Sequence, residues 1–230
     1  MKNVILKLRN GEIFYRKLLV PEGLTSTEIM SILNNNEYIK GKINTIPKEG
    51  SIFPDTYFFK RNDDIKLIVK RMENRMVKEL NKVWKEGKKL FSSKRDLVTF
   101  ASIIEAETKK NYEKYLVSSV FHNRLKKNMK LQADATVLYG KNLNLRLKSR
   151  KLVKRDLKKD TAWNTYTRRG LPITPICNPG LISLKAAISP AKSDYLYFVS
   201  DGKGGHRFSK NLEKHNENIK AWKNMNKKND

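Results

Sequence analysis

The chain contains a single cysteine, Cys177, among its 230 residues. No disulfide can therefore form within the chain, and stability has to come from a packed core, which a chain of this length can bury. Long apolar runs are missing too: no window of about 18 apolar residues occurs, so nothing in the sequence is expected to span a bilayer. The start (MKNVILKLRNG) is too short and too interrupted by basic residues to be a signal peptide.

The familiar signals of metal and nucleotide sites are also absent. His122, His206 and His215 are scattered along the sequence, and neither an HExxH nor a CxxC pattern occurs. The glycine-rich run 202–205 falls in an expected hairpin turn, and no GxSxG nucleophile motif occurs. We therefore expect no metal ion and no other cofactor.

Acidic residues are few: 23 Asp and Glu stand against 49 Lys and Arg, which gives a net charge of +26. Such a charge attracts polyanions, whether nucleic acid, anionic lipid headgroups or carboxylate-bearing wall polymers. The basic residues are spread along the chain and are not grouped with stacking aromatics, as they are in many nucleic-acid sites. We therefore expect no nucleic acid as partner, and a biased genome composition would explain the lysine content equally well.

Hydrophobic periodicity predicts an α+β chain, with helices first and a short sheet later. Residues 12–20 are expected to form a strand, and an aromatic strand is expected within residues 48–60. Between them, Thr25 or Ser26 can cap a short helix with Glu28 in its first turn. The residues expected to face inward from this helix are Ile29, Met30, Ile32 and Leu33.

Four longer helices are expected downstream. They begin at Asp63 or Asp64, at Ser92 or Ser93, at Asn111 and at about Leu212. Residues 129–140 are expected to be extended and then briefly helical, and the basic stretch 141–160 to be a loop. Residues 195–208 read as a β-hairpin with a glycine-rich turn.

Two glutamates in the run ASIIEAET are candidates for chemistry. Because a helix turns by about 100° per residue, Glu105 and Glu107 point to nearly opposite sides and cannot act as a pair. Glu105 follows two isoleucines and is the carboxyl expected to be partly desolvated, which would raise its pKa as a general acid requires. Two solvated surface glutamates would produce the same local pattern.

Two polar segments are candidates for binding sugars. In LQADAT an extended backbone would place Gln132, Asp134 and Thr136 along one side, where they could grip hydroxyl and acetamido groups. A solvated edge strand would look the same. The second segment contains Asn164 and Tyr166 and continues through proline and glycine residues to Asn178-Pro179-Gly180, which suggests a shaped binding rim or a structural loop.

Many of these segments together resemble the YceG-like family of endolytic lytic transglycosylases (MltG). The matching runs, in the family's order, are VPEG, FPDTY, ASIIEAET, VFHNRL, MKLQADATVLYG, WNTY, GLPITP, NPG, SLKAAISP and YLYFVSDGKGGHRFSKNLEKHN. The resemblance covers roughly residues 12–222. It departs from the family's usual pattern at Ala106, at Ala135 and in the LPITPI loop.

The resemblance implies an activity and a substrate. Members cut nascent peptidoglycan strands between N-acetylmuramic acid and N-acetylglucosamine, leave a 1,6-anhydro end, and so terminate strand elongation. It implies Glu105 as the catalytic acid. We expect the following residues to bind the sugars around it: Gln132, Asp134, Thr136, Asn164 and Tyr166. A catalytically silent protein that binds murein through the same pocket is the alternative.

The resemblance also implies an organisation and a setting. Residues 1–48 are expected to be part of a LysM-like α/β subdomain, and residues 49–230 a catalytic domain of helices packed on a small sheet or hairpin. The setting is expected to be the bacterial inner membrane, facing the periplasm, although the family's anchor segment has no counterpart in this sequence. Glycan strands are the expected partner, with peptidoglycan synthases and an anionic membrane surface as further candidates.

Overall fold

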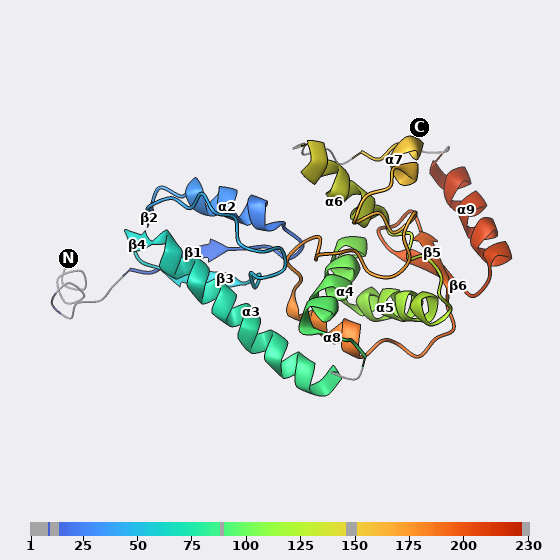
Figure 1. The fold of residues 1–230 in the computed structure, drawn as a ribbon, viewed down its shortest axis with the longest axis horizontal. Coiled ribbons are helices and arrows are strands. Elements are labelled where there is room, and N and C mark those ends of the chain that lie inside the picture. Colours follow the sequence, from blue (N-terminus) through green and yellow to red (C-terminus); the bar gives the residue numbers. More distant parts are fainter. Residues whose placement is uncertain (1–8, 10–13, 88–89, 146–150, 227–230) are drawn as a thin grey trace.

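The structure, a computed structural model, describes residues 9, 14–87, 90–145 and 151–226. Within these ranges, eight helices and six short strands form an α+β fold. The strands make three separate two-stranded sheets, two of them near the N-terminus and one near the C-terminus. The expected order of helices first and sheet later is therefore wrong, because strand pairs flank the helices on both sides (Figure 1).

The N-terminal unit is a small α/β assembly. Strand β1 (Arg16–Leu19) pairs antiparallel with β3 (Thr56–Phe59), and β2 (Ile39–Lys40) pairs in parallel with β4 (Asp63–Asp64). Helix α2 (Ser26–Asn34) supplies the rest of its core. The buried side chains of this core are Leu18, Val20, Ile29, Met30, Leu33, Ile39, Ile52, Phe59, Ile65, Ile68, Val69 and Met72. The core thus continues well past residue 48.

Helix α2 begins where the sequence predicts. The Thr25 hydroxyl accepts a hydrogen bond from the Glu28 backbone N–H, and the Glu28 carboxylate accepts one from the Thr25 N–H, which completes a capping box. Ile32 is 37% exposed, however, so its predicted inward position is wrong. It lies about 100° around the helix from Leu33, at the margin of the buried stripe.

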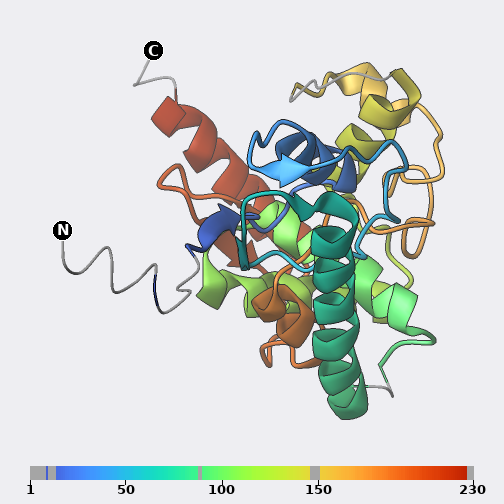
Figure 2. The ribbon, with the colours of Figure 1, turned by 90° about the vertical axis from the view of Figure 1, so that its left-hand side faces the viewer.

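Helix α3 (Ile65–Gly87) links the two halves of the molecule. Its first part packs in the N-terminal core, whereas Met76 and Val83 belong to the second core. Figures 1 and 2 show the helix passing from the N-terminal strands to α8 (Leu181–Ile188). At this end Gly87 allows the close approach, since a Cβ there would lie 2.2 Å from a side-chain carbon of Ile188.

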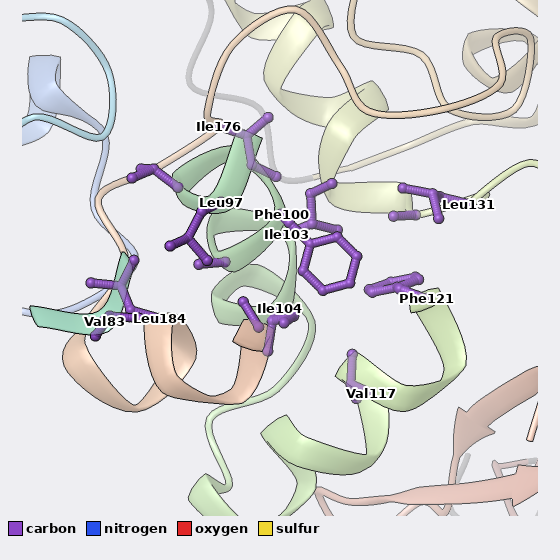
Figure 3. Close-up of a cluster of buried hydrophobic side chains, with 14 of the residues drawn as sticks. Val83, Leu97, Phe100, Ile103, Ile104, Val117, Phe121, Leu131, Ile176 and Leu184 are labelled. Atoms are coloured by element: carbon purple, nitrogen blue, oxygen red, sulfur yellow. The ribbon is translucent and has the colours of Figure 1, made fainter. Parts of the chain in front are cut away.

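The second core is built around α4 (Lys94–Glu107). This helix begins after Ser93, whose hydroxyl accepts from the Asp96 N–H, and it packs with α5 (Asn111–Lys126) and α8. Phe100 of α4 meets Phe121 of α5 edge to face at 6.2 Å (Figure 3). The middle of α4 is buried on all sides, and only its two ends reach the surface.

The remaining elements cover this core. Helix α6 (Asp134–Leu145) already begins at Asp134, and a short α7 (Lys154–Lys158) lies within the stretch expected to be a loop. The hairpin of β5 (Tyr197–Ser200) and β6 (His206–Ser209) is confirmed, and α9 (Leu212–Asn226) packs on it. Within the described residues, no helix has both the length and the apolar character needed to cross a membrane.

Candidate active site

A cavity of about 330 Å³ lies at the C-terminal end of α4. It is formed where this helix end meets α5, the start of α6, the loop around Tyr166, the hairpin and α9. The residues that line it are Glu107, Arg124, Leu131, Gln132, Asp134, Tyr166, Phe198 and His215. Most of these side chains are polar, and they come from segments up to about 100 residues apart, so only the tertiary fold brings them together.

Glu107 is the last residue of α4 and is partly exposed. Its Oε1 is buried and has no hydrogen-bond partner among the described residues. Burial, followed by the negative charge of Asp134, raises the pKa of Glu107 from 4.5 to about 7, although Arg124 acts in the opposite direction. The C-terminal end of a helix also disfavours a negative charge. Glu107 is therefore a carboxyl that holds its proton close to neutral pH.

A second carboxylate stands in the same cavity. Asp134 occupies the first turn of α6, where the helix macrodipole stabilises a negative charge. The Tyr166 hydroxyl donates a hydrogen bond of 2.5 Å to Asp134 Oδ1. Burial and this bond raise the pKa of Tyr166, so its phenol stays protonated and can keep donating. The cavity thus holds one protonatable carboxyl and one anchored carboxylate, in different environments.

Arg124 lines the same cavity and is fixed by several hydrogen bonds. Its Nε donates to the Leu196 carbonyl at 2.6 Å, and its Nη1 donates to the Leu131 carbonyl at 2.9 Å and to Gln132 Oε1 at 3.3 Å. These bonds tie α5 to the segment before α6 and to the approach to β5. Gln132 has a positive φ of 52°, an uncommon conformation for a non-glycine residue, and Arg124 holds its amide in place.

Hydrogen bonds between Thr108, Glu113 and His206 also fix the helix end that carries Glu107. Thr108 donates to the Glu113 carboxylate at 3.1 Å, and His206 Nδ1 lies 2.8 Å from the same oxygen. Although burial raises it, hydrogen bonds from His206 and Thr108 bring the pKa of Glu113 below its usual value. The ionised Glu113 therefore joins the end of α4 to α5 and to the hairpin.

The predicted sugar-binding residues divide into two groups. Gln132, Asp134 and Tyr166 line the cavity. Thr136 and Asn164 are completely buried and are not among the residues that line it. The predicted row of Gln132, Asp134 and Thr136 on one side of an extended segment is wrong, because the chain becomes helical at Asp134 and the alternation of faces ends there.

The two buried residues organise the cavity wall instead. The Thr136 hydroxyl donates to the Ala133 carbonyl at 2.7 Å and lies 2.9 Å from the Thr165 hydroxyl. Asn164 donates to the Lys159 carbonyl at 2.7 Å, and its Oδ1 accepts from the Tyr166 N–H at 2.8 Å. Both side chains therefore position Asp134 and Tyr166 without reaching the cavity.

Glu105 lies on the other side of α4, as the helical spacing predicts, and it faces the protein interior. Its Oε1 accepts from Lys114 Nζ at 2.8 Å, and its Oε2 accepts from the Gly180 N–H at 3.0 Å and the Ser183 hydroxyl at 2.6 Å. Glu105 is 8% exposed and Lys114 is 1% exposed. A carboxylate with these partners is well satisfied, and Glu105 does not line the cavity that contains Gln132, Asp134 and Tyr166.

The predicted rim segment divides: Tyr166 lines the cavity, whereas the part around Asn178 joins the two halves of the molecule. Asn178 is completely buried; its Oδ1 accepts from the Ile52 N–H at 2.9 Å, and its Nδ2 donates to the Leu24 carbonyl and to Glu49 at 3.0 Å. Lys114 also reaches Glu22 of the N-terminal unit at 3.2 Å. Glu105 and Asn178 therefore belong to the polar junction between the two halves of the molecule.

Five cavity residues were not predicted as site residues from the sequence: Glu107, Arg124, Leu131, Phe198 and His215. The helix-face argument separated the two glutamates correctly but favoured the more buried one. Glu107 is the last residue of its helix, so it borders a loop and the cavity. That terminal position, directly before Thr108, was the available signal for Glu107.

The chain is similar to several known proteins. The model of the YceG-like family matches residues 1–221. An endolytic murein transglycosylase of Bacillus subtilis is 41% identical over 172 residues, which are 74% of this chain and 47% of that protein. An endolytic murein transglycosylase of Streptococcus pneumoniae (strain D39) is 33% identical over 177 residues, 74% of this chain and 31% of that protein. The matched region thus spans about half or less of these relatives.

A solved structure shares the fold. A YceG-like protein from Listeria monocytogenes superposes with a TM-score of 0.74 at 32% sequence identity, over 94% of this chain and 80% of that chain. The superposition includes both the N-terminal unit and the helical core, since so little of the chain is left out.

Proposed function

Because the chain belongs to the YceG-like family, we propose that it is a lytic transglycosylase that cuts within peptidoglycan glycan strands. The names of its relatives support murein as the substrate. The observation that carries the proposal is Glu107, a carboxyl with a pKa of about 7 in an open, polar cavity. A general acid works best when its pKa lies near the operating pH.

Glu107 acts first as an acid in this proposal. It donates its proton to the glycosidic oxygen between N-acetylmuramic acid and N-acetylglucosamine, and the bond from that oxygen to C1 of the muramic residue breaks. Positive charge develops at C1 and the ring oxygen in an oxocarbenium-like transition state. The glucosamine residue leaves with a hydroxyl at C4.

Glu107 then acts as a base. Its carboxylate takes the proton from the C6 hydroxyl of the same muramic residue while that oxygen bonds to C1, which closes the 1,6-anhydro ring and restores the acid. No water is consumed, and intramolecular attack supplies a high effective concentration of the acceptor. A single group with a pKa of about 7 suits both steps, because donating and accepting the proton are then nearly balanced.

The neighbouring residues supply charge and position. The carboxylate of Asp134 favours the positive charge of the transition state, and the Tyr166 phenol holds that carboxylate through its 2.5 Å hydrogen bond. Gln132 offers an amide to sugar hydroxyl or acetamido groups, with its own orientation set by Arg124. Thr136 and Asn164 support this arrangement from behind.

The proposal places the acid at Glu107 and gives Glu105 a bracing role. Both Glu105 oxygens already accept hydrogen bonds from Lys114, Gly180 and Ser183, and Glu105 does not line the cavity. Glu107 has neither restriction. The two assignments make opposite predictions for a matched pair of variants.

The test is digestion of purified peptidoglycan by the unsubstituted chain, by Glu107→Gln and by Glu105→Gln, with product masses measured. We expect products one water lighter than hydrolysis products from the unsubstituted chain and from Glu105→Gln, and none from Glu107→Gln. The reverse pattern would assign the acid to Glu105. Products of hydrolytic mass would indicate a muramidase that uses Asp134 as a second catalytic group, and binding without cleavage would indicate a silent murein-binding protein.

The cellular setting follows from the family and stays a prediction. We propose that the protein works on the periplasmic side of the bacterial inner membrane, next to peptidoglycan synthases. Its net charge of +26 would favour residence near anionic lipid or wall polymer. Fractionation of cells that express the native gene, with and without a high-salt wash, would separate electrostatic retention from a covalently continuous anchor.

A further inference from the structure

His215 is the cavity residue contributed by α9, the last helix of the fold. This helix packs on the hairpin of β5 and β6, and none of its residues belongs to either hydrophobic core. In Figure 1 it lies at the far edge of the molecule, away from the N-terminal unit. Its link to the cavity through a polar ring therefore calls for an explanation other than core packing.

The orientation of the His215 ring is set by an aromatic stack. Its centroid lies 5.0 Å from that of Tyr197, and the two rings are tilted by only 24°. The guanidinium of Arg124 lies 5.1 Å from the centre of the same Tyr197 ring. The histidine is thus held as one member of a rigid group that includes a cavity residue already tied to Gln132.

A ring nitrogen of His215 lacks a hydrogen-bond partner in the part of the chain that the structure describes. This nitrogen, Nδ1, is buried. Buried polar atoms in native proteins are nearly always paired with protein, water or ligand. Burial, and then the charge of Arg124, lower the pKa of His215, so at neutral pH the ring is uncharged and has one donor and one acceptor.

Sugars match this combination. A hydroxyl or an acetamido group both donates and accepts hydrogen bonds, as a neutral imidazole does, and neither carries a charge. Phe198, which lines the same cavity, offers an apolar ring for the C–H face of a sugar. The charged groups of the cavity, Asp134 and Arg124, are meanwhile engaged by Tyr166 and by backbone carbonyls.

We propose that His215 contacts the glycan and hydrogen-bonds an uncharged polar group of the sugar bound next to the scissile bond. The ring is a substrate-binding group here and takes no proton in the reaction. This inference rests on the proposed function, since it assumes that the cavity holds a glycan. It assigns α9 a place in the binding site and not only on the surface of the fold.

The test measures binding and not only cleavage. In the Glu107→Gln background, which removes turnover, affinity for soluble oligomers of alternating N-acetylglucosamine and N-acetylmuramic acid is measured by calorimetry. His215→Phe keeps a ring that can stack on Tyr197 but removes both nitrogens, whereas His215→Gln restores a polar group near the position of Nε2. Lys220→Gln, an exposed change on the same helix, is the matched control.

We expect His215→Phe to weaken binding by roughly three- to tenfold, the effect of one neutral hydrogen bond, with its melting temperature preserved. His215→Gln should recover most of the loss, and Lys220→Gln should bind like the parent. Equal affinity of His215→Phe and the parent would overturn the inference. Equal losses in both His215 variants together with a lowered melting temperature would also overturn it, because they indicate packing alone.

The same experiment separates this inference from the proposed function. If the unsubstituted chain cuts murein and His215→Phe binds normally, only the role of His215 is refuted. If the unsubstituted chain neither cuts murein nor binds the oligomers, the proposed function and the role of His215 both fall.

Discussion

The proton on Glu107 depends on the charge of Asp134, and removing that charge should move the pH dependence of cleavage. Burial makes the larger contribution to raising the Glu107 pKa from 4.5 to about 7, and Asp134 makes the next. The net rise is about 2.5 (7 − 4.5) after Arg124 has acted in the opposite direction, and for the charge of Asp134 we expect a share on the order of 1 pH unit, about 1.4 kcal/mol.

Asp134→Asn should therefore lower the Glu107 pKa to about 6, because the variant removes a negative charge that disfavours the Glu107 carboxylate. The first step needs protonated Glu107, so activity falls as pH rises through this pKa. The alkaline limb of kcat/KM should move down by about 1 pH unit. At pH 7 the protonated fraction would drop from about one half to about one tenth, a roughly fivefold loss from protonation alone.

The assay follows cleavage of soluble glycan oligomers between pH 4.5 and 9 for the unsubstituted chain, Asp134→Asn and Tyr166→Phe. Tyr166→Phe is the matched control, because it removes a hydrogen bond to Asp134 but neither charge. Its limb should stay in place even if its maximal rate falls. An alkaline limb that does not move in Asp134→Asn, or that moves upward, would refute the electrostatic reasoning and the assignment of the acid to Glu107.

Three further predictions concern stability. Because the Glu107 pKa is higher in the folded chain than in the unfolded chain, its contribution to folding is present below about pH 4.5 and is lost as pH rises through about 7. Glu107→Gln should therefore be more stable than the unsubstituted chain at pH 8, by up to about 3 kcal/mol. The same difference in melting temperature between the two chains at pH 4.5 and at pH 8 would contradict this. Glu105→Gln should destabilise the fold by about 2–3 kcal/mol in urea unfolding, because it leaves the buried Lys114 with only the partly exposed Glu22 as a charged partner. An unchanged urea midpoint would count against a bracing role. Gly87→Ala should cost about 1–3 kcal/mol because its methyl group meets Ile188, and combining it with Ile188→Ala should cost less than the sum of the two single changes if the clash is real.

Local sequence determined the elements whose causes lie within a few residues. Thr25 and Glu28 are three residues apart and form the capping box that starts α2. The apolar spacing from Ile65 to Val83 specifies one buried face of α3. Gly202 and Gly204, which lie between β5 and β6, have positive φ, as a tight turn requires. Each of these features depends on residues that are close together in the sequence. The fold implied by the family resemblance is built from such elements.

Helical geometry also determined that Glu105 and Glu107 diverge, since that depends only on the turn per residue. It could not say which direction leads to the core. Glu105 meets Ser183, which lies 78 residues away, whereas Glu107 shares a cavity with Tyr166 and His215. The isoleucines before Glu105 predicted a partly desolvated acid, and in the structure the same burial surrounds a carboxyl that already bonds Lys114, Gly180 and Ser183.

Tertiary structure decided the site because its groups meet only when distant segments pack. Arg124 bonds both Gln132 and the Leu196 carbonyl before β5. Asn178 instead bonds Leu24 and Ile52 of the N-terminal unit and does not line the cavity. Hydrogen-bond partners of this kind are chosen by the whole fold, since a polar side chain bonds whichever group packing brings within about 3 Å. The sequence showed which polar residues are present. Which of them line the cavity and which lie in the junction between the two halves depended on the packing of α4 between the two.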